Sequence, residues 1–200
     1  MGLAALPHGS LEVGVNGIDQ TPMAVGDHWT YRFHPGTKRY DVDITESKVI
    51  NGATTCAVAI DQDYSYMAVL PTGVYQVAQG EPADPQNAVI FDPPQRIYKL
   101  PFVVGDSWQT PVLLEPTQPK SGVVQLYGRV EAFEDVSVPA GKFSNCVRVL
   151  IDDPRDSPSD VTELWFAPGV GIVQTQTYIQ RSDSLPPKTY QTQLVSYELK

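Results

Sequence analysis

The chain has 200 residues and a formal net charge of −9 at pH 7, and 42% of its residues are hydrophobic. This length and apolar fraction are enough for a buried core, which excludes wholesale disorder. The sequence contains no run of about 18 apolar residues, so no membrane-spanning helix is expected. The acidic charge argues against nucleic acid as a partner, because binding to a phosphate backbone depends on clustered Lys and Arg.

The first segment, residues 1–21, is expected to be a tail that contains a possible strand. Leu11, Val13 and Val15 alternate with other residues in the stretch 10–18, which is typical of a half-buried strand. Such a strand can close the chain's own sheet, or it can add to the sheet edge of a neighbouring molecule and build a fibre. The segment lacks the basic start of a signal peptide. Either the chain is cytosolic, or a leader has been removed ahead of Met1.

A sequence repeat divides the rest of the chain. Residues 22–29 (PMAVGDHW) and 101–108 (PFVVGDSW) share Pro, Val, Gly, Asp and Trp at corresponding positions. We therefore expect two copies of one β unit, over residues 22–80 and 101–180, within one composite domain. A proline-rich connector is expected over 81–100, and a closing strand within 181–200. The shared structural motif consists of Gly26, Asp27 and Trp29 in the first unit and of Gly105, Asp106 and Trp108 in the second.

Hydrophobic residues recur with a period of two. Trp29, Tyr31 and Phe33 alternate with polar residues, which favours a strand over a helix. Asn51-Gly52 lies between two such runs and is typical of a type I′ hairpin turn. The short connections predict antiparallel pairing. The expected fold class is all-β, with antiparallel sheets built from two tandem copies of a β unit in a curved sheet, half-barrel or sandwich, and little or no helix.

Two segments of the second unit carry a family resemblance. VPAGKFSNC (138–146) and WFAPGVGIV (165–173) follow the segment LPFVVGDSW (100–108). This pattern resembles that of uncharacterised bacterial secreted proteins and lipoproteins, over about residues 100–180. The resemblance implies an antiparallel β fold, such as the curved sheet of lipoprotein carriers, and it implies no catalytic residues. It also implies an extracytoplasmic location: the periplasm, the cell surface or the medium.

Candidate catalytic residues are few. The sequence contains no G-x-S-x-G, S-x-x-K or H-E-x-x-H motif, and its three histidines all fall within the first 34 residues. Asp41 and Asp43 share one face of an expected strand at a distance of about 6–7 Å, which overlaps the carboxyl spacing of inverting glycoside hydrolases. A solvated polar strand face explains the same pattern. The chain is therefore expected not to be an enzyme, with a glycoside hydrolase as the remote alternative.

An acidic segment is the weak candidate for a metal site. Hard cations such as Ca²⁺ bind several oxygen ligands from a flexible loop, and the segment 152–160 carries four aspartates. Their spacing differs from that of an EF-hand, and a polar hairpin tip is the alternative interpretation. No cofactor is expected. The weak calcium candidates are Asp152, Asp153, Asp156 and Asp160.

The two cysteines, Cys56 and Cys146, occupy corresponding places in the two units. With no CxxC motif and no Cys/His cluster, they do not indicate a zinc site. A disulfide between them would close a loop of about 90 residues and stabilise the fold, provided that their α-carbons come within about 7 Å. Two separate buried thiols are the alternative.

Aromatic residues supply the candidate ligand-binding positions, which are Tyr31, Tyr64 and Tyr66. A row of exposed aromatic rings on a sheet is typical of carbohydrate-binding modules, whereas a concave apolar sheet holds acyl chains. The leading hypothesis is a non-enzymatic extracytoplasmic β protein that binds a hydrophobic ligand or an envelope component. Its expected partner is a lipid, a glycan or an envelope protein. The alternatives are a carbohydrate-binding module and a structural or adhesive subunit that assembles through residues 10–18.

Overall fold

The computed structural model describes residues 21–61, 63–80, 89–113, 122–154, 160–179 and 188–200. In this part of the chain there are twelve β-strands and no helix, which confirms the expected fold class. The strands are β1 (His28–His34), β2 (Arg39–Ile50), β3 (Ala53–Ile60), β4 (Asp63–Leu70), β5 (Gly73–Gln79), β6 (Val89–Lys99), β7 (Ser107–Leu113), β8 (Val123–Val138), β9 (Gly141–Asp152), β10 (Asp160–Ala167), β11 (Gly171–Ile179) and β12 (Lys188–Glu198). Within the same residues, no helix has the length and hydropathy needed to cross a membrane.

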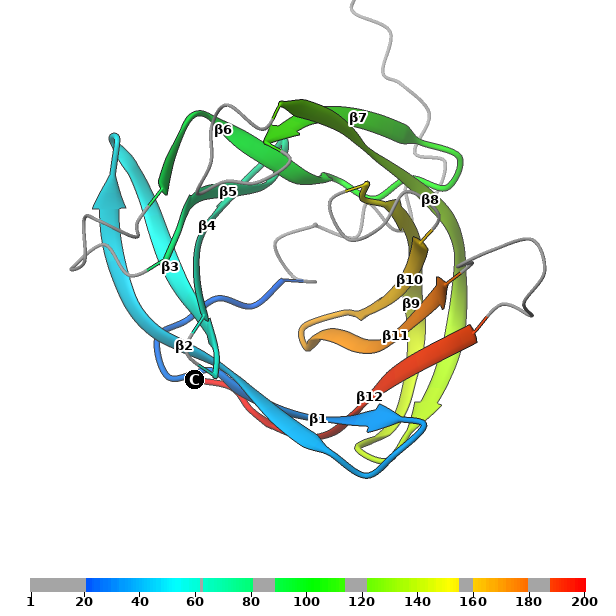
Figure 1. Ribbon diagram of the computed structural model, residues 1–200. Coiled ribbons are helices and arrows are strands. Elements are labelled where there is room, and N and C mark those ends of the chain that lie inside the picture. Colours follow the sequence, from blue (N-terminus) through cyan, green and yellow to red (C-terminus); the bar gives the residue numbers. More distant parts are fainter. Residues whose placement is uncertain (1–20, 62, 81–88, 114–121, 155–159, 180–187) are drawn as a thin grey trace, which may run out of the picture.

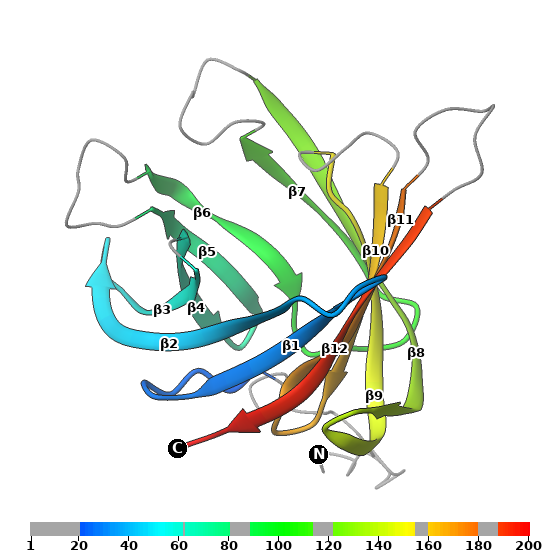
Figure 2. The same ribbon diagram turned by 60° about the horizontal axis from the view of Figure 1, so that its bottom comes forward.

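All twelve strands belong to one antiparallel sheet, in the order β6-β5-β4-β3-β2-β1-β12-β11-β10-β9-β8-β7. The sheet curves into a ring (Figure 1). The first and last described strands, β1 and β12, pair with each other and join the two halves of the ring. The two edges of the sheet are β6 and β7, which are consecutive in sequence and diverge away from their connection (Figure 2).

The two repeated segments adopt the same local structure ahead of β1 and β7. In the first, the Gly26 amide donates to the carbonyl oxygen of Ile44 over 2.8 Å, and the Ile44 amide donates to the carbonyl oxygen of Asp27 over 2.9 Å. The second segment makes the equivalent pair of bonds with Val130, both at 2.9 Å. β1 and β7 each open a run of six strands in the sheet order. The origin of the two halves from one duplicated unit stays a prediction from the sequence.

The segments that flank the two units each contain a described strand. β12 lies within the expected closing segment 181–200. The segment 81–100, interpreted as a connector, instead contains the strand β6. Pro93 and Pro94 obscure its alternation, and an edge strand tolerates proline because the missing N–H has no neighbouring strand to bond. The possible strand at 10–18 lies outside the described residues.

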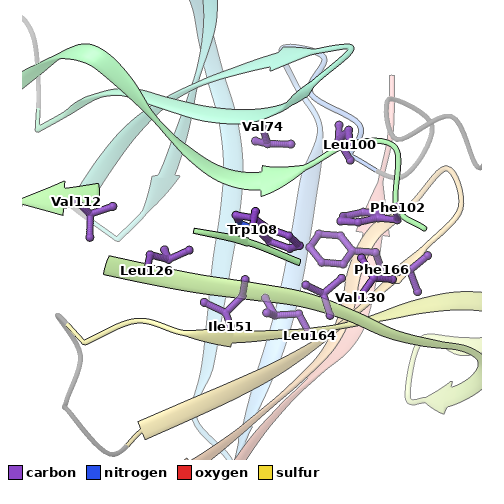
Figure 3. Packing of buried hydrophobic residues seen from close by; sticks show 12 residues of the cluster. Val74, Leu100, Phe102, Trp108, Val112, Leu126, Val130, Ile151, Leu164 and Phe166 are labelled. Carbon is purple, nitrogen blue, oxygen red and sulfur yellow. The ribbon is translucent and has the colours of Figure 1, made fainter. Parts of the chain in front are cut away.

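The larger core cluster packs on the inner face of the ring. Figure 3 shows Trp108 of β7 near Val74 of β5, with Phe102 and Phe166 beside it. The Trp108 ring lies directly over Gly128 of β8, where any Cβ atom would overlap the indole. Trp29 and Trp108 are both buried. The tryptophans of the repeat are therefore core anchors, each on the first strand of its half.

Candidate functional site

The inner face of the ring leaves a cavity of about 310 Å³, called here the central cavity. Thr21, Pro22 and Met23, the first described residues, line it together with side chains from both halves of the ring. Figure 1 shows this blue segment starting inside the ring. The other hydrophobic lining residues are Trp29, Tyr31, Val42, Ile44, Val58, Met67, Val74, Ile97, Tyr98, Phe166 and Ile172.

Two polar side chains of the lining, Tyr31 and Gln76, form hydrogen bonds within the protein. The Tyr31 hydroxyl donates to the carbonyl oxygen of Ile172 over 2.7 Å, and the Gln76 amide donates to the Ser65 hydroxyl over 3.3 Å. Burial is the main cause that raises the pKa of Tyr31, with smaller contributions from the neighbouring Tyr40 and Tyr98. The phenol therefore stays neutral, and the cavity contains no ionised tyrosine at ordinary pH.

Tyr98 of β6 stands between the central cavity and a second cavity of about 200 Å³. Ile97 and Tyr98 line both, and Asp153 and Thr162 line only the second. Burial, followed by the charge of Asp153, raises the pKa of Tyr98 to about 12. The second cavity is thus the more polar of the two, and it has a carboxylate in its wall.

Beyond the second cavity, the inner face of the sheet carries hydroxyl and aromatic side chains. Leu164, which lines that cavity, lies opposite Thr175 in the β10–β11 ladder, and Thr175 lies opposite Thr192. Residues directly opposite each other point to the same face of a sheet, so these threonines also face inward. Their hydroxyls are 2.6 Å apart. The Phe33 and Tyr190 rings stack in the adjoining part of the wall, with centroids 5.5 Å apart.

A third cavity, of about 610 Å³, lies in the slot between the sheet edges β6 and β7. At one end side chains close the slot: Trp108 Nε1 donates to the carbonyl oxygen of Ile97 over 3.1 Å, and Lys99 Nζ lies 2.5 Å from Asp106 Oδ2. Within the described residues, β6 and β7 share no backbone ladder. The slot is therefore the one break in the hydrogen-bonded ring formed by these residues.

The three tyrosines proposed from the sequence do not lie together. Tyr31 lines the central cavity. Tyr66 is only 1% exposed and belongs to a separate cluster with Ala57 and Ala78, which Tyr64 also contacts. Neighbouring residues of a strand point to opposite faces, and Met67 is the residue of this pair that lines the central cavity. The three tyrosines thus form no exposed aromatic row.

The aspartates of β2 bind neighbouring side chains on β1. Asp43 Oδ1 lies 2.7 Å from His28 Nδ1, and Asp41 Oδ1 accepts a hydrogen bond from Thr30 over 2.7 Å. All of these partners are half-buried or exposed. Cross-strand polar pairs of this kind stabilise a sheet, and they account for Asp41 and Asp43 without a catalytic role.

The calcium candidates are described only in part. Asp152 ends β9, where it lies opposite Val161 in the β9–β10 ladder, and Asp153 lines the second cavity. Asp156 and the side chain of Asp160 lie outside the described residues. Among the residues that the structure describes, no group of three or more His, Cys, Asp or Glu side chains is placed to hold a metal ion.

Both cysteines are free thiols in the structure. Cys56 donates to the carbonyl oxygen of Met23 over 3.0 Å, and Cys146 donates to that of Phe143 over 3.5 Å. The proposed disulfide is therefore not formed here. Burial is the main cause that raises the pKa of the Cys146 thiol, to about 11. These thiols are structural rather than reactive.

The sequence matches no family model, and no curated protein matches it. Two solved structures are similar in fold. One is a candidate lipoprotein from Parabacteroides distasonis, with 14% identity over 90% of this chain and 98% of the other, and a TM-score of 0.44. The second is a candidate exported protein with a YmcC-like fold from Bacteroides fragilis, with 14% identity over 88% of this chain and 97% of the other, and the same TM-score of 0.44.

Proposed function

We propose that this protein binds a hydrophobic ligand in the central cavity and has no catalytic activity of its own. The observation that carries the proposal is a cavity of about 310 Å³ in the inner face of a twelve-stranded sheet, lined mainly by apolar side chains. Protein interiors are ordinarily close-packed, so an apolar space of this size is unusual. Ligand sites in proteins are concave and mostly apolar, with a few placed polar groups.

The chemistry of the lining supports an apolar ligand rather than a reacting one. Burial keeps the Tyr31 phenol neutral by raising its pKa, and the Gln76 and Ser65 side chains bind each other. None of the described residues in the lining is a Lys, Arg, His, Asp, Glu or Cys. General acid–base and nucleophilic catalysis both draw on such groups. The cavity therefore suits the hydrocarbon part of a lipid.

The experiment is a titration with Nile red, an uncharged dye whose fluorescence rises in apolar sites. Saturable binding of one dye per chain is expected. Val58 lines the central cavity, and Val58→Trp fills part of it, so this variant should bind the dye at least about tenfold more weakly. Val49→Trp is the matched control, because Val49 is 68% exposed on β2. Unchanged binding by Val58→Trp, in a protein that still folds, contradicts the proposal.

We also propose an extracytoplasmic location, and the support for it is the resemblance of residues 100–180 to secreted proteins and lipoproteins. A carbohydrate-binding module is less well supported, since Tyr64 and Tyr66 contribute to a buried cluster. The cellular location can be tested in the native host. Cell fractionation with an antibody against the chain should recover it outside the cytoplasm, and recovery with a cytoplasmic marker enzyme contradicts this part of the proposal.

A further inference from the structure

One side chain in the slot between β6 and β7 has a buried hydrogen-bond acceptor without a donor among the described residues. Gln95 of β6 is only 6% exposed, and its Oε1 atom is buried without a hydrogen-bond partner among the described residues. Most buried polar groups in proteins are paired, because an unpaired one loses its hydration without compensation. Gln95 lines the slot. An occupant of the slot that donates a hydrogen bond would satisfy this acceptor.

The slot itself is unsuited to an added β-strand. Pro93 and Pro94 lie on the β6 side and Pro111 on the β7 side, and proline has no N–H with which to pair a new strand. The apolar side chains of Ile90 and Val123 also line the slot, so it offers hydrophobic contacts together with the buried acceptor of Gln95. This combination fits a small amphiphile better than an extended peptide.

Strands β5 and β6 contribute residues both to the slot and to the central cavity. Gln76, which lines the central cavity, lies directly opposite Gln95 in the β5–β6 ladder. Neighbouring strands are about 4.8 Å apart, so one ligand of modest length can contact both residues. Among the described residues that line the slot, one is acidic and one is basic, Asp92 and Arg96. With one charge of each sign, these residues offer no net charge to compensate an ionised head group.

We propose that the ligand is an uncharged amphiphile whose polar end carries a hydroxyl or amide donor. Its hydrocarbon part lies in the central cavity, and its donor enters the slot and binds Gln95 Oε1. This inference rests on the proposed function, and it adds the chemical class of the ligand and the residue that selects it. Gln95 is then a specificity-determining residue, because it favours ligands that can donate a hydrogen bond over ligands that cannot.

The test uses two isomeric probes, n-decanol and nonyl methyl ether. They have the same atoms, but only the alcohol can donate a hydrogen bond. Isothermal titration calorimetry of the delipidated protein should show that the alcohol binds about tenfold more tightly than the ether, as expected for a buried hydrogen bond. In Gln95→Met, which keeps the length of the side chain but removes the acceptor, the two affinities should agree within about twofold. Gln109→Met is the matched control: Gln109 lines the same slot but is exposed.

The possible results distinguish a failure of the Gln95 assignment from a failure of the proposed function. Equal binding of alcohol and ether by the unmodified protein overturns the assignment of Gln95 and leaves the proposed function intact. Discrimination that persists in Gln95→Met also overturns it. Failure of both probes to bind contradicts the proposed function itself. The comparison of the two probes on the unmodified protein needs no variant, so it is decisive even if Gln95→Met does not fold.

Discussion

The indole of Trp108 donates a hydrogen bond to the carbonyl oxygen of Ile97 across the break in the ring, over 3.1 Å. Trp29, its counterpart in the repeat, donates to the carbonyl oxygen of Val170 over 2.7 Å. β1, the strand that carries Trp29, has ladder partners on both sides, whereas β8 is the single ladder partner of β7 among the described strands. The bond of Trp108 therefore links two strands that no backbone ladder joins.

Trp108→Phe should destabilise the protein and loosen the two edge strands. The substitution removes the bond to Ile97 and reduces packing over Gly128, so the free energy of unfolding in urea should fall by about 2 kcal/mol. Amide hydrogen exchange in β6 and β7 should become faster. Trp29→Phe is the matched control, and it should leave exchange in β6 and β7 unchanged. Equal exchange rates in the two variants would refute this role of Trp108.

Gly128→Ala should be strongly destabilising, because the added methyl group overlaps the Trp108 ring. Overpacking in a core costs about 1–3 kcal/mol, and thermal unfolding should detect it as a lower Tm. Combining Gly128→Ala with Trp108→Leu should recover part of the loss, since the smaller side chain leaves room for the methyl group. Strict additivity of the two substitutions in a double-mutant cycle would show that they do not interact.

The two aspartates of the repeat should differ in their effect on stability. Asp27 is 1% exposed and accepts bonds from the amides of Ala24 and Lys200, over 2.7 and 2.9 Å. Asp27→Ala leaves two donors without partners, so we expect a loss of about 2–4 kcal/mol. Asp106 pairs with Lys99 in a partly exposed position, and Asp106→Ala should cost less than about 1 kcal/mol. Chemical denaturation measures both, and similar losses would contradict the structure.

Stability should fall at high pH because of the buried tyrosines. Burial raises the pKa of Tyr98 from 10.0 to about 12, so the folded state holds a proton that the unfolded state releases between these values. The stabilisation is complete below pH 10 and is lost as the pH rises to about 12, by on the order of 1 kcal/mol per pH unit. Tyr98→Phe should flatten this part of the profile.

The cysteines should titrate as two free thiols. Without reductant, a thiol reagent should count two thiols per chain after denaturation, because Cys56 and Cys146 bind different carbonyl groups. In the folded protein at neutral pH the Cys146 thiol should react slowly, since its pKa is raised to about 11 and the thiolate is the reactive form. A count of zero after denaturation would indicate a disulfide and a rearranged strand packing.

The sequence predicts much of the local structure correctly. The two-residue period of Trp29, Tyr31 and Phe33 identifies β1, and Asn51-Gly52 forms the turn between β2 and β3 with positive φ angles of 48° and 77°, as a type I′ turn requires. In both cases the local structure is determined by residues that are neighbours in the sequence. Hydrophobic alternation and turn-forming residues act over a few positions, so they predict strands and turns even when the arrangement of the whole sheet is unknown.

The candidate site depends instead on contacts between residues that are far apart in the sequence and meet only in the folded chain. Of the three tyrosines proposed, Tyr31 alone lines the central cavity. The pattern of β4 does not show which of its faces turns inward, so Tyr66 could not be distinguished from Met67. Tyr98 and Gln95 follow a pair of prolines that obscured β6. A double proline flanked by alternating residues is the signal that could have identified an edge strand there.

The break in the ring between β6 and β7 marks a position at which the chain could be cleaved into two fragments. The break lies near the middle of the sequence, between β6 and β7, whereas the ladder of β1 and β12 joins the first and last described strands at the centre of the sheet order. Cleavage in the short link over residues 100–106 would produce two six-stranded fragments with no ladder hydrogen bond lost within either. One ladder and the shared core around Trp108 would hold them together. The two fragments are therefore expected to reassemble by fragment complementation.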